Sequence, residues 1–461
     1  MMVLSRSARR PSSGRPLSRL RAAVVLGWIA FPACSSPQPP GPQLDAGGVA
    51  PRPSLDGAAP ADVALLDAVS ASGDGSADAS DGPGIGDAGD ASEEADAPPV
   101  TPVLKVATGG SSTCAILTDG TVRCWGLGYG LGYIATQRCG VSQLPCSLRP
   151  TEVPGLTQVT DLALGDGFAC AVKLDGTVAC WGANTYGQLG DGTTNDHVAP
   201  APVPGLSTVT HVVAGQSHAC ALLQGASVEC WGRNIEGELG DGTVTTRSTP
   251  GSVTGLGVAT GIAAEDLATC ARLANSTAQC WGYNERGELG NGNVASSPAP
   301  TAVSGLGNVL SVGGSGTTSG YGFGCAALAD GTARCWGENS VGQLGSGATS
   351  YDELLPVAVA GLSNVAELEP GGAHGCARLT DGTARCWGAN LAGQLGDGTT
   401  ISRPTIAPVT GLTGAMQLAA RGPMTCAVVT GGQLYCWGIN DDGQLGDGTT
   451  VQRSTPVAVV W

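Results

Sequence analysis

The chain has 461 residues with 38 acidic and 22 basic side chains, which gives a net charge of −16. Only Lys105 and Lys173 are lysines, and neither follows a glycine-rich loop, which argues against a phosphate-binding loop for nucleotides. Nucleic-acid binding is also disfavoured, because attraction to phosphates needs clustered lysines and arginines.

Residues 1–34 have the pattern of an export segment. Six arginines and no acidic residue precede an apolar stretch, residues 22–33, which is too short to span a bilayer permanently. Cys34 follows Ala33 and precedes two serines, which resembles a bacterial lipoprotein processing site, although Phe31 and Pro32 depart from its usual pattern. The segment therefore predicts lipidation of Cys34, with ordinary release by signal peptidase as the alternative.

Residues 35–100 consist mainly of Asp, Ala, Gly, Ser and Pro, with almost no aromatic residue. Such a composition cannot bury enough apolar surface to fold, so we expect a disordered linker. Repulsion among its aspartates should extend it. The linker is interpreted as a tether that lifts the folded part from a membrane surface, or as a spacer without a specific partner.

Residues 101–461 repeat one core, Cys-(nine residues)-Cys-Trp-Gly, seven times. A β-hairpin is expected between the two cysteines, because Thr118-Asp119-Gly120 and its counterparts read as three-residue loops. That loop length places the cysteines opposite each other, close enough for a disulfide. The expected pairs are Cys114 with Cys124, Cys170 with Cys180, Cys220 with Cys230, Cys270 with Cys280, Cys325 with Cys335, Cys376 with Cys386, and Cys426 with Cys436.

Cys139 and Cys146, in a longer segment of the first repeat, form a further expected pair. Paired cysteines at a repeated spacing indicate an oxidising compartment. The alternative is that they are small buried side chains of a reduced protein. A zinc site is disfavoured, because the spacing is not Cys-x-x-Cys and the chain has only 4 histidines.

The Trp after each second cysteine points to the opposite face of its strand and is expected to pack against the neighbouring unit. A turn, Gly-x-Asn-x-x-Gly-(Gln/Glu)-Leu-Gly, follows it in all repeats but the first, which lacks the Asn. The seven cores are joined by six Gly-Leu linkers, and the C-terminal strand, residues 455–460, follows the last core. We expect this strand to complete the first unit and close an all-β, seven-bladed β-propeller over residues 101–461.

The run from Gly215 to Ala221, Gly-x-x-His-x-Cys-Ala, followed by Cys-Trp-Gly-x-Asn-x-x-Gly-x-Leu-Gly, resembles the regulator of chromosome condensation repeat family. The resemblance covers residues 101–461 and implies a propeller. It also implies chromatin binding or guanine-nucleotide exchange, as in eukaryotic members. The acidic ring argues against the chromatin role, and no exchange loop is identifiable. The paired cysteines depart from the eukaryotic members.

No catalytic constellation emerges from the histidines. His218 and His374 occupy a slot that other repeats fill with Ser, Phe, Ala or Met, which indicates packing. His197 and His211 have no evident Ser or Cys partner for a triad.

Four repeated aspartates, Asp191, Asp241, Asp397 and Asp447, suggest either calcium ligands or turn formers. The turn is favoured, because Asn291 and Ser346 substitute at this position. We therefore expect no metal and no cofactor.

Recognition is expected in the blade-connecting loops, which vary in sequence on a rigid scaffold. The candidate anchors are Tyr186, Ile235, Tyr283 and Leu391, with ordinary variation of solvated loops as the alternative. The sequence thus predicts an extracytoplasmic monomer, in a bacterial cell envelope or secreted, that binds a protein or glycan without catalysis and touches a membrane only through its lipid. The alternatives are a lyase or hydrolase with a site at the channel mouth, or a guanine-nucleotide exchange factor.

Overall fold

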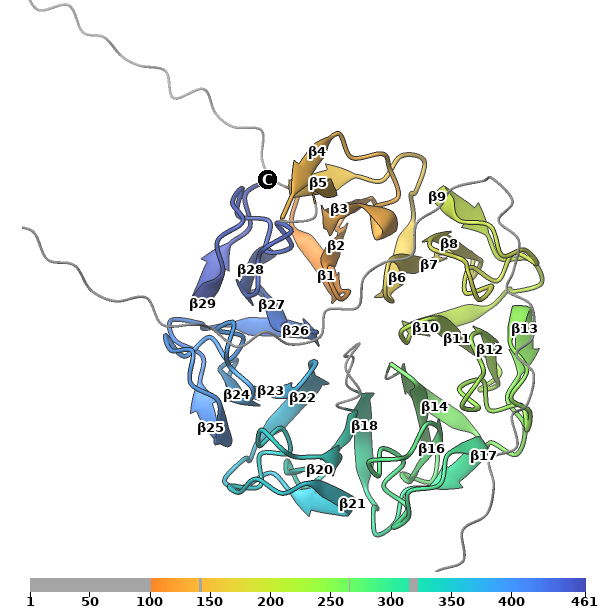
Figure 1. Ribbon diagram of the computed structural model, residues 1–461, viewed down its shortest axis with the longest axis vertical. Coiled ribbons are helices and arrows are strands. Elements are labelled where there is room, and N and C mark those ends of the chain that lie inside the picture. The colour runs from red at the N-terminus through yellow and green to blue at the C-terminus, as the bar shows by residue number, and fades with distance from the viewer. Residues whose placement is uncertain (1–100, 141–142, 265, 315–321) are drawn as a thin grey trace, which may run out of the picture. The chain divides into compact units, whose positions relative to one another are not determined.

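The computed structural model describes residues 101–140, 143–264, 266–314 and 322–461. They form seven antiparallel sheets arranged as blades around a central axis (Figure 1). The predicted all-β, seven-bladed propeller is thereby confirmed. The expectations for residues 1–34 and 35–100, including Cys34, lie outside the described residues. Within the described part, no helix is long and apolar enough to cross a membrane.

The first blade has five strands and the only helical element among the described residues, the 3₁₀ helix η1 (Gly128–Gly130). Its spatial order from the axis outward is β1 (Val103–Thr108), β2 (Ser112–Leu117), β3 (Val122–Leu127), β5 (Leu144–Glu152) and β4 (Gln137–Cys139).

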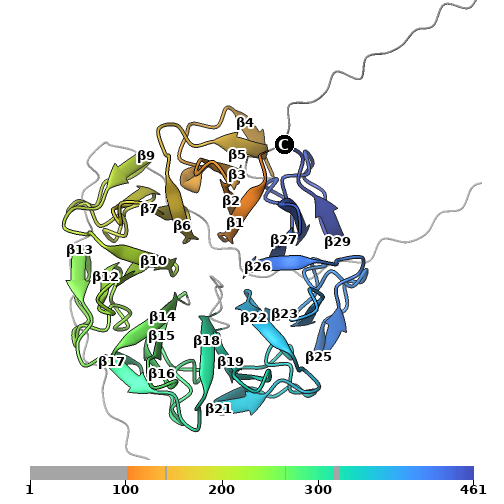
Figure 2. The same cartoon turned by 180° about the vertical axis from the view of Figure 1, so that it is seen from behind.

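Each of the other six blades has four strands in chain order, with the first strand nearest the axis (Figure 2). The second and third blades comprise β6 (Val159–Leu164), β7 (Phe168–Lys173), β8 (Val178–Gly182), β9 (His197–Pro202), and β10 (Val209–Ala214), β11 (His218–Leu223), β12 (Val228–Gly232), β13 (Arg247–Ser252). The fourth and fifth comprise β14 (Ala259–Ala264), β15 (Ala268–Leu273), β16 (Ala278–Gly282), β17 (Ser297–Ala302), and β18 (Val309–Gly314), β19 (Phe323–Leu328), β20 (Ala333–Glu338), β21 (Asp352–Ala358). The sixth and seventh comprise β22 (Val365–Pro370), β23 (His374–Leu379), β24 (Ala384–Gly388), β25 (Arg403–Pro408), and β26 (Ala415–Arg421), β27 (Met424–Val429), β28 (Gln433–Gly438), β29 (Arg453–Ala458).

The expected closure by the C-terminal strand is wrong. Strand β29 pairs with β28 and is the outermost strand of the seventh blade. In the first blade, the strand that pairs with the outer side of β3 is β5. Every blade takes its four main strands from one continuous stretch of chain. Six linkers are therefore enough to join the seven blades, and no strand from the C-terminal end has to complete the first blade. The ring closes instead through contacts between intact blades, such as the Val103 N–H donating to the Gly432 carbonyl at 2.9 Å.

The cysteines of each hairpin are paired as the loop length predicts. Cys170 lies directly opposite Cys180 in the ladder, with Cα atoms 4.1 Å apart, and the same arrangement recurs in all seven blades. An eighth disulfide joins Cys139 on β4 to Cys146 on β5. The structure therefore holds eight disulfides, and the seven hairpin bridges lie in the buried centre of their blades.

The seven tryptophans after the second cysteines join neighbouring blades, as predicted. Each indole is fully buried, and its Nε1–H donates to a backbone carbonyl of the preceding blade, as Trp231 does to Gln188 at 2.9 Å. The same bond is made by Trp125, Trp181, Trp281, Trp336, Trp387 and Trp437. Trp125 of the first blade bonds Gln444 of the seventh, so the closing interface uses the same contact as the other six.

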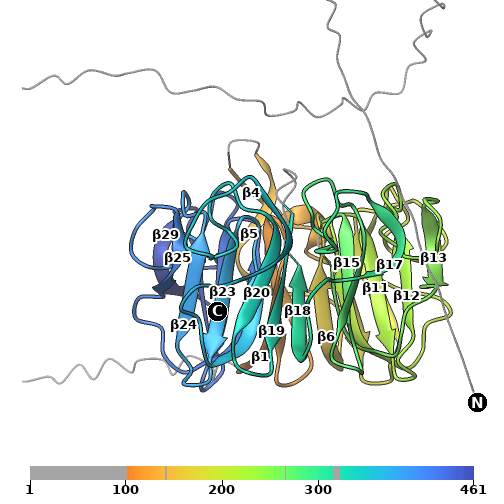
Figure 3. The ribbon, with the colours of Figure 1, turned by 90° about the horizontal axis from the view of Figure 1, so that it is seen from below.

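The antiparallel order divides the connections between two rims (Figure 3). One side of the ring carries the connections between the first and second strands of each blade and between its third and fourth strands. We call this side the upper rim. The lower rim carries the cysteine hairpins and the Gly-Leu linkers. In Figure 3, β4 lies at the upper rim.

Candidate functional site

In every blade but the first, the upper-rim turn after the tryptophan contains a buried asparagine that holds it. In the second blade, Asn184 Oδ1 accepts from the Leu189 N–H at 3.0 Å, and Nδ2 donates to the carbonyl of Asn195 at 2.9 Å. Equivalent bonds are made by Asn234, Asn284, Asn390 and Asn440. Each buried amide forms hydrogen bonds to two separate parts of the same connection between strands. The backbone of the turn is therefore held in one conformation, and so are the neighbouring residues exposed on it.

Gly190 illustrates why the turn needs glycine. Its φ is +71°, and a Cβ there would lie 2.7 Å from Nε1 of Trp231 in the next blade. The backbone of the turn therefore packs directly against the indole of the next blade, and a side chain at this position would disturb that contact.

The four expected anchors occupy matching upper-rim turns in four blades. Leu391 is 81% exposed, Ile235 is 52% exposed and Tyr186 is 37% exposed. Tyr283 is partly buried, and its hydroxyl donates to Glu285 at 3.0 Å. Because they belong to the second, third, fourth and sixth blades, they share a rim but form no single cluster around it (Figure 1).

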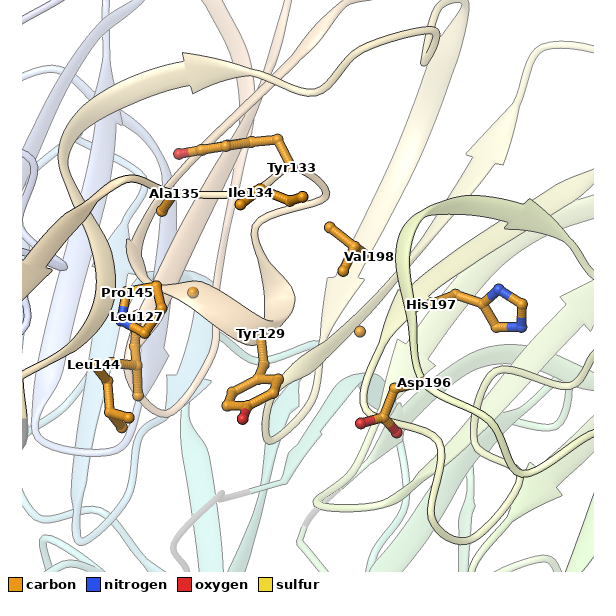
Figure 4. Close-up of a pocket in the computed structure, with 12 residues that line it drawn as sticks. Leu127, Tyr129, Tyr133, Ile134, Ala135, Leu144, Pro145, Asp196, His197 and Val198 are labelled. Carbon is orange, nitrogen blue, oxygen red and sulfur yellow. The ribbon is translucent and has the colours of Figure 1, made fainter. Parts of the chain in front are cut away.

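A groove that the sequence did not predict lies between the first two blades (Figure 4). Its volume is about 210 Å³, and its first-blade wall includes Tyr129, Ile134 and Leu144. Val198 of β9 faces Ile134 across the groove. Tyr129 is 51% exposed and Ile134 is 80% exposed, so this part of the upper rim presents large apolar side chains to solvent.

The groove is built by the unusual connection of the first repeat. Residues 128–140 and 143–146 form η1, β4, the start of β5 and the Cys139–Cys146 disulfide in place of the asparagine-bonded turn. Tyr133 is fixed below the surface, since its hydroxyl donates to the Cys124 carbonyl at 2.9 Å, and burial raises its pKa. The longer first-repeat segment and its two tyrosines were the available sequence signal, but Val198 lies more than fifty residues away in the chain.

Polar groups at the second-blade side of the groove are already engaged. Asp196 accepts from the Asn184 N–H at 2.8 Å. His197 turns away from the groove in Figure 4, with its Nε2 2.8 Å from Asp191. The groove therefore offers mainly apolar contact.

A buried carboxyl group, that of Glu288, lies at the upper rim between the fourth and fifth blades. Burial raises the pKa of Glu288 to about 7, and its Oε1 has no hydrogen-bond partner in the described part of the chain. The equivalent Glu238 of the third blade is paired with Arg233, whereas the fourth blade has Tyr283 in place of that arginine. Asp352 of β21 lies nearby and adds its negative charge. Arg286 lies near both carboxyl groups and is paired with Asp352 at 3.8 Å, so this part of the upper rim carries charges of both signs.

The histidines singled out in the sequence have structural partners. His218 and His374 are fully buried, and their Nε2 atoms lie 2.9 and 2.8 Å from the hydroxyls of Thr269 and Thr425 in the next blade. Burial lowers the pKa of each to about 3. These contacts support the interpretation as packing residues.

The repeated aspartates form turns. Asp191 Oδ1 accepts from the N–H of Thr193 at 2.8 Å, and Asp241, Asp397 and Asp447 do the same with Thr243, Thr399 and Thr449. Each carboxylate is thus used within its own turn, which supports the turn-forming interpretation.

One histidine lies in a charged cluster at the lower end of the channel. Asp161 accepts from the Val212 N–H at 2.9 Å, lies 2.5 Å from His211 Nδ1, and is paired with Lys105. Burial opposes ionisation of Asp161, but His211 and Lys105 hold its pKa well below its usual range. These contacts use both carboxylate oxygens and join the first three blades. The cluster therefore stabilises the packing between these blades.

Comparisons with known proteins agree with the fold. Two models of the regulator of chromosome condensation (RCC1) repeat match the chain, one over residues 175–222, 280–320 and 431–461, the other over residues 103–130, 159–188, 209–238 and 317–343. Among solved structures, human WBSCR16 has a TM-score of 0.65 and 21% identity, over 74% of this chain and 94% of that chain. Yeast RCC1 (Prp20), solved bound to Kap60, has a TM-score of 0.64 and 20% identity, over 78% of this chain and 86% of that chain. At these identities the likeness concerns the fold.

Curated relatives match over shorter stretches. The chain is 44% identical over 75 residues to the human probable E3 ubiquitin-protein ligase HERC3, and 37% identical over 95 residues to the human E3 ubiquitin-protein ligase HERC2. The matches cover 16% and 20% of this chain but only 7% and 2% of those two relatives.

Proposed function

The chain is an RCC1-repeat propeller, and we propose that it is an exported, non-catalytic scaffold that binds a protein or glycan partner through its upper rim. The observation that carries the proposal is the groove of about 210 Å³ between the first two blades, with Ile134 and Tyr129 exposed beside it. Exposed apolar side chains grouped around a concave surface are typical of interaction sites.

The surface is suited to recognition because its backbone is pre-organised. The upper-rim turns are held by buried asparagines, and the groove by a disulfide, so little conformational entropy is lost when a partner binds. The groove supplies an apolar centre, while Tyr186, Ile235, Tyr283 and Leu391 extend the contact around the rim. The mainly apolar lining favours a protein over a glycan.

Export is supported by the cysteines. Eight disulfides in one folded unit are typical of an oxidising, extracytoplasmic compartment. With a lipid on Cys34 and residues 35–100 as a tether, the propeller would face partners in the cell envelope.

Affinity capture from envelope extracts tests the proposal. The bait is the full chain in three forms: unchanged, with Ile134→Ser and Val198→Ser in the groove, and with Leu174→Ser as a control. Leu174 is 71% exposed on a lower-rim hairpin, so its replacement removes a similar apolar side chain from the other face. We expect the groove variant to lose a partner that the control retains. Equal recovery by all three would contradict the proposal for the groove.

The other expected anchors are tested separately with alanine at Tyr186, Ile235, Tyr283 and Leu391. Reduced recovery by this variant would extend the binding surface around the rim. Unchanged recovery would confine it to the first two blades.

A further inference from the structure

The central channel contains a cavity of about 250 Å³ lined by the innermost strands of all seven blades. Water occupies roughly 30 Å³ per molecule in the liquid, so the cavity has room for about eight waters or one small organic molecule. It is separate from the upper-rim groove, because the two share no lining residue.

One level of this channel is formed by the residue of each innermost strand that pairs with the first cysteine of its blade. Six of these seven residues are small and apolar: Ala107, Ala163, Val213, Ala263, Gly313 and Ala419. The seventh is Glu369 of β22, opposite Cys376. At this level a single carboxyl group therefore projects among small side chains, while Lys105, His211 and Arg421 line other parts of the cavity.

The other charged residues that line the cavity are already paired. Lys105 and His211 both contact Asp161. Arg421, at the end of β26, donates to the Ala214 carbonyl at 2.8 Å and to Asp266 at 3.1 Å, which links the seventh blade to the third and fourth. Glu369 has no hydrogen bond or ion pair through its side chain among residues 101–140, 143–264, 266–314 and 322–461.

The surroundings of Glu369 make its charge costly. Burial, and then the negative charge of Glu367 two residues before it, raise the pKa of Glu369 to about 8, and Lys105 opposes this only in part. Glu367 itself accepts from Arg378 at 3.0 Å and from the Leu418 N–H at 3.0 Å, so it is not available to a ligand in the same way. The side chain of Glu369 is half-buried and lines the cavity, so a cation placed beside it would offset its negative charge.

We infer that the channel cavity is a binding site for a small alkylammonium ion, whose charged head pairs with Glu369 and whose apolar body lies against the alanine-rich wall. An N–H donor with a positive charge forms a strong hydrogen bond to a carboxylate in such surroundings. A divalent metal ion fits less well, because it needs several oxygen ligands and this level of the channel supplies one carboxyl group.

Calorimetric titration of the full chain with n-butylammonium chloride tests the inference, with n-butanol as the neutral probe. We expect saturable binding of butylammonium at millimolar concentration and none of butanol. Because the carboxylate must be ionised to bind, the affinity should rise at least about tenfold between pH 6 and pH 9. Absence of saturable butylammonium binding at pH 9, or equal binding of butanol, would overturn the inference.

Variants locate the site. Glu369→Gln should abolish butylammonium binding, while Glu152→Gln, which removes the same charge from an exposed position on β5, should leave it unchanged. Ala263→Leu keeps every charge but fills the apolar wall, so it should weaken binding severalfold without removing the pH dependence. Undiminished binding by Glu369→Gln would place the ligand elsewhere and contradict the assignment.

Discussion

The indole of Trp125 meets the indole of Trp461 edge-on, with ring centroids 6.2 Å apart and planes inclined by 72°. Trp125 belongs to the first blade and Trp461 is the last residue of the chain. The end of the chain thus lies against the beginning of the ring, although its last strand belongs to the seventh blade. Closure depends on side-chain packing and on bonds between intact blades.

Replacement of Trp461 should therefore weaken the ring without removing a strand. An edge-to-face aromatic pair contributes roughly 0.5–1.5 kcal/mol beyond area burial, so we expect Trp461→Ala to lower the free energy of unfolding by about 1–2 kcal/mol. Urea denaturation measures the change, with Val460→Ala as the control. If both variants were as stable as the unchanged chain, the tryptophan pair would have no part in closure.

Each hairpin disulfide should add measurable stability. The Cys170–Cys180 bridge closes a loop of sequence separation 10, for which the chain-entropy model gives about 2–3 kcal/mol. The double variant Cys170→Ala with Cys180→Ala should lose about this amount in urea denaturation. Alkylation of the unreduced chain supplies a second measurement: extensive modification of the hairpin cysteines before reduction would contradict the disulfide assignment.

Replacement of a turn asparagine should lower the free energy of unfolding. Asn184→Ala leaves the Leu189 N–H and several carbonyls without their side-chain partner, and a buried unsatisfied group costs about 1–3 kcal/mol. Asn195→Ala, in the same turn but exposed, is the matched control. Equal losses of stability from both changes would show that the buried amide is not what holds the turn.

The two buried histidines predict a loss of stability in acid. Their pKa is about 3 in the folded chain and about 6.5 when unfolded, so between these values the unfolded chain binds more protons. Stability from this source is full above pH 6.5 and declines as the pH falls toward 3. Two other blades carry Phe168 and Phe323 at this position, so a variant with His218→Phe and His374→Phe should fold and show a shallower decline. An unchanged pH profile in urea denaturation would contradict this account.

Lipidation of Cys34 stays a prediction from the sequence. Cys34→Ser should release the protein from the membrane fraction and abolish incorporation of labelled fatty acid. If the unchanged chain carried no label and were recovered in the soluble fraction, release by signal peptidase would be the better explanation.

The sequence predicted those parts of the fold that depend on spacing within one repeat. The cysteine pairing and the tryptophan contacts follow from strand alternation and hairpin length, and the structure confirms both. Closure could not be settled in this way, because the strand partner of β29 depends on whether the ring exchanges a strand. The repeat pattern is compatible with both arrangements.

The candidate sites depend on proximity between repeats, which spacing does not reveal. Ile134 and Val198 become neighbours only when the first two blades pack together. Glu369 stands out only when the seven innermost strands are compared at one register position, where the other residues are small. In six of the seven repeats this position lies seven residues before the first cysteine, as Glu369 does before Cys376, but in the longer fifth repeat it is Gly313, twelve residues before Cys325.

Site-specific photo-cross-linking in intact cells tests the central claim, partner binding at the upper rim, most directly. A photoreactive amino acid is placed at Ile134, which is 80% exposed beside the groove, or at Leu174, which is 71% exposed on the lower rim. The account predicts a discrete adduct with a protein partner from position 134 and none from position 174. An adduct from position 174 alone, or no adduct from either position, would contradict it.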